Sequence, residues 1–220
     1  MLWVSASTAS IAWRQCCVDL LANGYPVAEK GFFREESASI EISNIKDGLH
    51  DSASPMSQED IEIVSRYLVS GECEDMVNHE WTKVYRKRLF VEEPQIQRVI
   101  SYLRIKRQGV RAQASLWNSA KDLYSECAPC LQVLWFRIVG EDLHLHVHMR
   151  TSDCYRKLLM NINQFIGLQE HVALEVQARP GKYVQFIDSL HFREVDREVI
   201  AEAVRQFKQD PRIRLSCSSQ

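Results

Sequence analysis

The sequence lacks the features that would place it in a membrane or in the secretory pathway. No apolar run approaches the roughly 18 residues that a helix needs to span a bilayer. The first 15 residues are MLWVSASTASIAWRQ. They have no basic segment before a continuous apolar stretch, so they do not predict a signal peptide. We therefore expect a cytoplasmic protein with no membrane partner.

The chain also lacks an excess of charge, internal repeats and low-complexity tracts. Its 27 Lys and Arg and 29 Asp and Glu give a formal net charge of −2, so no basic surface for nucleic acid is expected. The odd count of seven cysteines, without a secretion signal, indicates reduced thiols rather than a disulfide framework. A length of 220 residues with 45% hydrophobic residues is sufficient for one well-buried domain.

The periodicity of apolar residues predicts both helices and strands. Residues 155–176 have a largely apolar helical pattern, which is typical of a helix in the core. Residues 44–55 have the composition of a surface loop. Several strands precede the long helix without regular β-α-β alternation, which favours an α+β fold. Other helices are expected at 10–22, 57–71, 94–103 and 194–209, and strands at 31–43, 111–117, 131–139, 143–149 and 183–187.

Three histidines alternate on one expected strand, at His144, His146 and His148. Alternate residues of a strand project from one face, so the three rings would lie together. A zinc site normally adds a further ligand to such a pair. The other interpretation is a polar sheet face beside a ligand or a subunit interface. We favour this second interpretation and expect no metal.

The pair Cys127-Ala-Pro-Cys130 has the spacing of a thioredoxin-like redox motif. That motif requires a helix directly after the first cysteine. The residues after Cys130 are LQVLWFRIV, which predict a strand instead. A zinc site would need a second CxxC or CxxH pair, and the sequence has none. A redox pair and a zinc ligand pair are therefore both disfavoured.

A third interpretation makes Cys130 a nucleophile. Pro129 stiffens the backbone before Cys130, where the chain enters an expected buried strand. The following strand ends in Arg150-Thr151-Ser152-Asp153, a set of donors and hydroxyls suited to a phosphate. The thiol of Cys130 and this phosphate-binding group would then face the same cavity. The alternative is a buried cysteine and a surface salt bridge, and spacing alone does not choose between them.

These residues resemble the thymidylate synthase superfamily, which includes the pyrimidine nucleotide hydroxymethylases. The resemblance is good over residues 81–195 and loose over the N-terminal third. It implies an α+β fold in which a mixed sheet packs against the long buried helix. It also implies one thymidylate synthase-like domain over 1–220 and a homodimer with the sheet at its interface. The ordered elements that carry the resemblance are Val84-Tyr85, Pro129-Cys130, Arg150 to Asp153, Asn161 and Ser189-Leu190-His191.

The resemblance implies a folate-dependent one-carbon transfer to a pyrimidine nucleoside 5′-monophosphate. Cys130 would add to C6 of the base, which makes C5 nucleophilic towards the methylene group of 5,10-methylenetetrahydrofolate. Tyr85 would lie beside this nucleophile. Arg150 and Thr151 would hold the phosphate. A plain core role for Tyr85 remains the alternative.

The family pattern also implies roles for five further residues. Asn161 would bind the base, and Asp153, beside it, would order the cofactor side of the pocket. His191 would bond the sugar hydroxyl. Arg111 would reach the partner's phosphate across the dimer interface, and Arg34 would bind phosphate from the N-terminal loop. Structural roles remain open: Asn161 as a buried hydrogen-bonding amide, His191 as a strand cap, and Arg111 as a surface ion pair.

Several positions depart from the family pattern. Val110 and Leu131 stand where the synthases have an interface arginine and a histidine. Arg193 stands where they use a tyrosine on the sugar, and Lys157 falls in a glycine-containing turn that touches the folate. Glu62 is out of register with the glutamate of the N-terminal helix. The tail, RIRLSCSSQ, does not resemble the apolar C-terminus that closes over the cofactor.

These departures bear on the reaction. Reductive methylation transfers hydride and needs a closed, dry pocket, whereas hydroxymethylation needs only a water at the methylene group. The departures therefore favour 5-hydroxymethylation. The alternatives are thymidylate synthesis from dUMP and a non-catalytic nucleotide-binding homologue. The amide of Asn161 suits uracil but can flip to serve cytosine, so the base stays open, as does the sugar.

Overall fold

The computed structural model describes residues 1–27 and 31–213, and they contain a six-stranded mixed sheet. The strand order is β1-β2-β6-β5-β4-β3. The pairs β1–β2 and β5–β6 are parallel, and the others are antiparallel. This mixed α+β architecture confirms the expected fold class. The strands are β1 (Leu2–Ala6), β2 (Phe32–Ile42), β3 (Gln113–Ser115), β4 (Leu131–Val139), β5 (Asp142–Asp153) and β6 (Arg179–Arg193).

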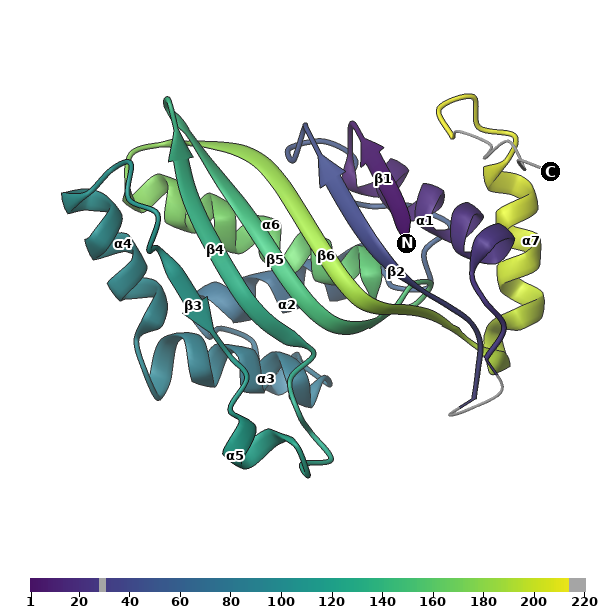
Figure 1. Cartoon of the computed structure of the whole chain (residues 1–220), viewed down its shortest axis with the longest axis horizontal. Coiled ribbons are helices and arrows are strands. Elements are labelled where there is room, and N and C mark those ends of the chain that lie inside the picture. Colours follow the sequence, from purple (N-terminus) through teal and green to yellow (C-terminus); the bar gives the residue numbers. More distant parts are fainter. Residues whose placement is uncertain (28–30, 214–220) are drawn as a thin grey trace.

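Helix α6 (Leu158–Glu175) lies against one face of the sheet (Figure 1). It is apolar on almost all sides because it is covered by the sheet on one side and by α2 (Gln58–Ser70) on the other. Helix α2 begins at the side-chain cap Ser57 and ends at Gly71, whose φ of 81° is the left-handed conformation that favours glycine. The opposite face of β4, β5 and β6 is crossed by no helix in the described part of the chain (Figure 1).

The remaining helices flank this centre. Helices α1 (Ala9–Asn23) and α7 (Arg197–Phe207) pack together beside β1 and β2. Helix α3 (Glu80–Arg86) continues as a π-helical turn, η2 (Lys87–Val91), and α4 (Gln95–Ile105) follows. Three short elements complete the described chain: η1 (Glu74–Met76), α5 (Ser119–Asp122) and η3 (Glu194–Asp196). Over residues 1–27 and 31–213, no helix is both long and apolar enough to cross a membrane.

The hairpin of β4 and β5 sets the position of the central strands. Gly140 has a φ of 61° in the turn, and Val139 pairs with Asp142 directly beside it. Strand β5 runs on past the end of this hairpin, and its last residues pair in parallel with the end of β6. Thr151 lies opposite Ser189, and Asp153 lies opposite His191. The C-terminal ends of two adjacent parallel strands are thus side by side, where ligands commonly bind.

Several boundaries differ from those expected. Strands predicted at 143–149 and 183–187 extend over 142–153 and 179–193, because long-range pairing continues beyond the apolar core of each pattern. The helix predicted from residue 155 begins at Leu158, after a turn held by Asp153. The elements β1, α3, η2 and α5 were not predicted. Of the tail, residues 214–220 lie outside the described residues.

Candidate functional site

A cavity of about 240 Å³ lies at the C-terminal ends of β5 and β6, where they meet α3 and α6. Six of the nine residues expected in the site line it. They come from segments far apart in the sequence, so the fold gathers them. The lining residues are Phe32, Trp81, Tyr85, Cys130, Thr151, Ser152, Asp153, Lys157, Asn161, His191 and Arg193.

Cys130 lies directly before β4, with its side chain partly exposed to the cavity. Burial raises the pKa of its thiol above the usual value, and the positive charge of Arg150 lowers that pKa in part. Tyr85 is 1% exposed, and its hydroxyl accepts a 3.2 Å hydrogen bond from the backbone N–H of Leu131. Burial raises the pKa of Tyr85 far above its usual value, so this hydroxyl stays protonated. Cys130 therefore faces the cavity beside a neutral phenol.

Arg150 braces the loop that leads to Cys130. Its Nε and Nη2 atoms donate to the carbonyl oxygens of Pro129 and Ala128, each at 3.1 Å, and its backbone N–H donates to Cys130 O at 2.9 Å. The guanidinium does not line the cavity; it lies beside it. Since a guanidinium has five N–H donors, these two bonds leave others for a ligand.

Asn161 is presented to the cavity by α6 and is 4% exposed. Its Nδ2 atom donates to Ser152 Oγ at 3.2 Å. This bond fixes the direction of the amide and turns its oxygen away from Ser152. A buried amide beside a cavity can hydrogen-bond a polar heterocycle edge.

His191 is held from two sides. Its Nδ1 atom lies 3.1 Å from Thr151 Oγ1, and its ring stacks on Phe32 with centroids 3.8 Å apart. Burial lowers the pKa of His191, and the nearby carboxylate of Asp153 acts in the opposite direction. The ring is therefore neutral at pH 7. Thr151 lies against Nδ1 and the backbone of Ser189 also hydrogen-bonds the ring, so His191 can offer at most one nitrogen to a ligand.

Asp153 shapes the turn between β5 and α6. Its Oδ1 atom accepts from the backbone N–H groups of Tyr155 at 3.1 Å and Arg156 at 2.9 Å. Burial raises the pKa of this carboxyl above its usual value. Asp153 therefore has a structural function in this turn as well as a place in the cavity wall.

Several lining residues were not among the expected site residues. Trp81 precedes Tyr85 by one helical turn, and Ser152 lies between two expected residues of one strand, so spacing could have indicated both. The Nζ atom of Lys157 lies 4.7 Å from the ring centroid of Trp81 and 3.4 Å from the ring nitrogens of His79. Burial lowers the pKa of this lysine. One side of the cavity thus combines an aromatic face with a cation.

Two expected phosphate-binding arginines lie away from the cavity wall. Arg34 is on β2 and donates from Nη1 to the carbonyl oxygen of Gly24 at 2.7 Å. Arg111 is exposed and precedes β3. The structure brings neither into the site of its own chain.

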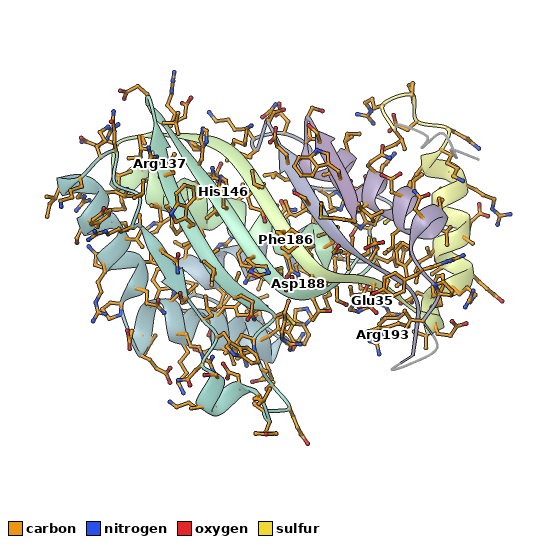
Figure 2. All side chains as sticks on the ribbon, in the orientation of Figure 1. Glu35, Arg137, His146, Phe186, Asp188 and Arg193 are labelled. Atoms are coloured by element: carbon orange, nitrogen blue, oxygen red, sulfur yellow. The ribbon has the colours of Figure 1, made fainter. Side chains whose placement is uncertain are left out.

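The three alternating histidines project from the uncovered face of the sheet. Figure 2 shows His146 there with Arg137 and Phe186. His146 lies edge-on to Trp135, and His148 Nε2 lies 3.0 Å from Asp188 Oδ2. Among residues 1–27 and 31–213, no group of three or more His, Cys, Asp or Glu side chains is arranged to hold a metal ion. On this face these histidines contact Trp135 and Asp188.

Comparison with known proteins identifies the class of this fold and site. The family model described as thymidylate synthase matches residues 5–220. A protein of Methanopyrus kandleri named "Putative thymidylate synthase" is 26% identical over 205 residues, which are 89% of this chain and 94% of that protein. One of the same name from Methanocaldococcus jannaschii is 26% identical over 215 residues, covering 90% and 93%. The thymidylate synthase of Fusobacterium nucleatum is 24% identical over 122 residues, covering 56% and 44%.

Because the family model matches nearly the whole chain, the chain belongs to the thymidylate synthase family. Its class is therefore that of a thymidylate synthase-like one-carbon transferase, as the resemblance of the sequence implied.

Proposed function

We propose that this protein transfers a one-carbon unit from 5,10-methylenetetrahydrofolate to C5 of a pyrimidine nucleoside 5′-monophosphate, and that it forms a 5-hydroxymethyl product. The observation that carries this proposal is the cavity that joins Cys130, Tyr85, Asn161 and His191. A binding protein has no need of a thiol at this position. The proposal covers residues 1–220 as a single domain, and it places the protein in the cytoplasm.

The nucleotide is placed by the polar groups of the cavity. Asn161 bonds the edge of the base, and His191 bonds a sugar hydroxyl. Thr151 and the remaining N–H donors of Arg150 bind the phosphate. In this position C6 of the base lies against the thiol of Cys130. The base, sugar and phosphate are thus each held by a different part of the site.

Cys130 reacts as a thiolate, because only the ionised sulfur is a good nucleophile. Burial raises its pKa, so in the free protein the thiol is mostly protonated at pH 7. Arg150 counteracts this through its positive charge. Addition of the sulfur to C6 would move an electron pair to C5 and make that carbon nucleophilic towards the methylene group. Loss of the C5 proton with departure of tetrahydrofolate, addition of water to the exocyclic methylene carbon and elimination of the sulfur would then give the hydroxymethyl product and restore the thiolate.

The residues not used by the nucleotide fit the folate. Trp81 and Phe32 offer aromatic faces for a planar ring, and Lys157 offers a cation for its carboxylates or carbonyl groups. The folate supplies a methylene group at the oxidation level of formaldehyde. In the free protein Lys157 covers Trp81, so we expect the lysine to move aside when the ring binds.

The polar character of this side supports hydroxymethylation over reductive methylation. Lys157 and the exposed Arg193 place two cations on the cavity wall, and charged groups keep water near. A water molecule at the methylene group gives a hydroxymethyl product, whereas hydride transfer requires that water be excluded. Formation of dTMP from dUMP is the second candidate, favoured by the names of the relatives.

We further propose a homodimer formed through the uncovered face of β4, β5 and β6. Arg150 lies at the end of this face, since it follows His146 and His148 on β5 at the same two-residue spacing. An arginine from a second subunit can therefore reach the same phosphate. Arg111, exposed in its own chain, is the residue proposed for this role.

Release of tritium from 5-tritiated UMP, dUMP, CMP and dCMP tests the reaction. We expect release that requires methylenetetrahydrofolate and falls by at least about a thousandfold in Cys130→Ala, since the covalent route is lost. Cys127→Ala is the matched control, because Cys127 is exposed and outside the cavity wall. Mass spectrometry of the product then separates a hydroxymethyl from a methyl group. If wild type and Cys130→Ala both release tritium only at the background rate, the result would instead support a nucleotide-binding protein.

A further inference from the structure

Arg193 lines the cavity together with His191. It follows His191 by two residues on β6, and both side chains line the cavity. In Figure 2, Arg193 lies at the end of β6. Its side chain is exposed, whereas His191 is 7% exposed. A ligand whose sugar bonds His191 therefore comes within reach of this guanidinium as well.

Two acidic residues near Arg193 are paired with other arginines, whereas the charge of Asp153 interacts with Arg193, and Glu35 pairs with His191 across β2 and β6. Arg197 donates to both carboxylate oxygens of Glu194 at 2.7 Å, and Arg156 donates to the carboxylate of Asp196. One oxygen of Asp153 is held by two backbone N–H groups. Within residues 1–27 and 31–213, no carboxylate forms an ion pair with Arg193 and no hydrogen bond engages its guanidinium. Among these described residues, the guanidinium at the mouth of the cavity has no hydrogen-bond partner.

His191 and Arg193 together offer more donors than one hydroxyl can use. With one nitrogen held by Thr151, His191 can bond a single sugar hydroxyl. A guanidinium presents several N–H donors in one plane and suits two neighbouring acceptors. The two adjacent hydroxyls of a ribose provide such a pair, whereas 2′-deoxyribose has only the 3′-hydroxyl.

We infer that Arg193 selects ribonucleotides by donating to the 2′-hydroxyl, beside the 3′-hydroxyl that His191 bonds. This inference rests on the proposed placement of the nucleotide. It predicts that UMP or CMP, rather than the deoxynucleotides, is the substrate. A hydrogen bond to a charged donor corresponds to a preference of about ten- to a hundredfold in affinity.

Binding to the Cys130→Ala protein tests the inference without depending on turnover. Calorimetric titrations with UMP, dUMP, CMP and dCMP give the ratio of ribonucleotide to deoxynucleotide affinity for each base. We expect a ratio of about ten or more, falling to about one when Arg193→Tyr or Arg193→Met is added. Arg205→Tyr is the matched control, because Arg205 is exposed on α7, away from the cavity. Thermal melting confirms that each variant is folded.

A fluorinated analogue separates hydrogen bonding from sugar shape. 2′-Deoxy-2′-fluoro-UMP keeps a ribose-like pucker but is a poor acceptor, so it should bind like dUMP. Binding like UMP would overturn the inference, as would a wild-type preference for dUMP or a ratio unchanged in both Arg193 variants. These results leave the proposed function intact if tritium release depends on Cys130. If no nucleotide binds or reacts, both proposals fail.

Discussion

At the scale of single residues, the reactivity of Cys130 depends on two opposing effects. Burial raises the pKa of the thiol, and the guanidinium of Arg150 lowers it. Because the thiolate is the reactive form, alkylation by iodoacetamide should accelerate as the pH rises through the thiol pKa. Arg150→Met removes the lowering effect, so the midpoint should move to higher pH and the rate at pH 8 should fall several-fold.

Peptide mass spectrometry after timed labelling measures this rate at Cys130 alone. Cys127 is exposed and serves as an internal reference, which should label equally in both proteins. A midpoint that is unchanged or lower in Arg150→Met would contradict the electrostatic role of the arginine.

Of the three scales, the residues of the site were the most predictable from the sequence. Cys130 was indicated by spacing and by the family resemblance, and Tyr85, Asn161 and His191 by the resemblance alone; all four line the cavity. Lys157 and Arg193 were recognised only as departures, because their role depends on neighbours that spacing does not reveal. The cation–π contact of Lys157, for example, needs Trp81 from a separate helix.

At the scale of elements, a partly buried ion pair joins η2 to α5. Arg88 donates to both carboxylate oxygens of Asp122, at 2.5 and 2.6 Å, and Asp122 is 2% exposed. The bond with Arg88 lowers the pKa of Asp122 below its usual value. Asp122→Asn leaves the partly buried Arg88 without its charge partner and should lower the free energy of unfolding by about 2 kcal/mol.

Denaturant unfolding at pH 7 measures this loss. A carboxylate whose pKa is lowered in the folded state stabilises it at higher pH, and this contribution disappears as the pH falls through the folded-state pKa. The difference between wild type and Asp122→Asn should therefore shrink below about pH 4, the unfolded-state value for aspartate. A difference that stays constant down to pH 2 would show that the charge is not responsible.

Elements were predicted where one local pattern dominated. The alternating or apolar runs at 131–139 and 155–176 gave a strand and a helix close to those observed. Strand β1 was missed because its five residues are stabilised by parallel pairing with the distant β2. The turn before α6 was missed because it depends on the side chain of Asp153 accepting two backbone N–H groups.

At the scale of the whole molecule, the uncovered sheet face determines the proposed assembly. Phe186 lies on this face beside His148, with ring centroids 5.3 Å apart (Figure 2). Phe186→Glu would bury a charge in the proposed subunit interface, so sedimentation should change from twice the chain mass to the chain mass. Activity should fall with it, because Arg111 no longer reaches the partner's phosphate. The control is Glu198→Gln on α7, an exposed residue on the other side of β2.

Strands β5 and β6 pair in parallel and are connected by α6, so the three form one β-α-β unit. All the groups proposed to recognise base and sugar lie in one uninterrupted crossover, from Thr151 to Arg193. The sulfur and the phenol come from outside it, on other parts of the chain. Selectivity can thus diversify by exchange of a single contiguous gene segment while the chemical step is inherited unchanged.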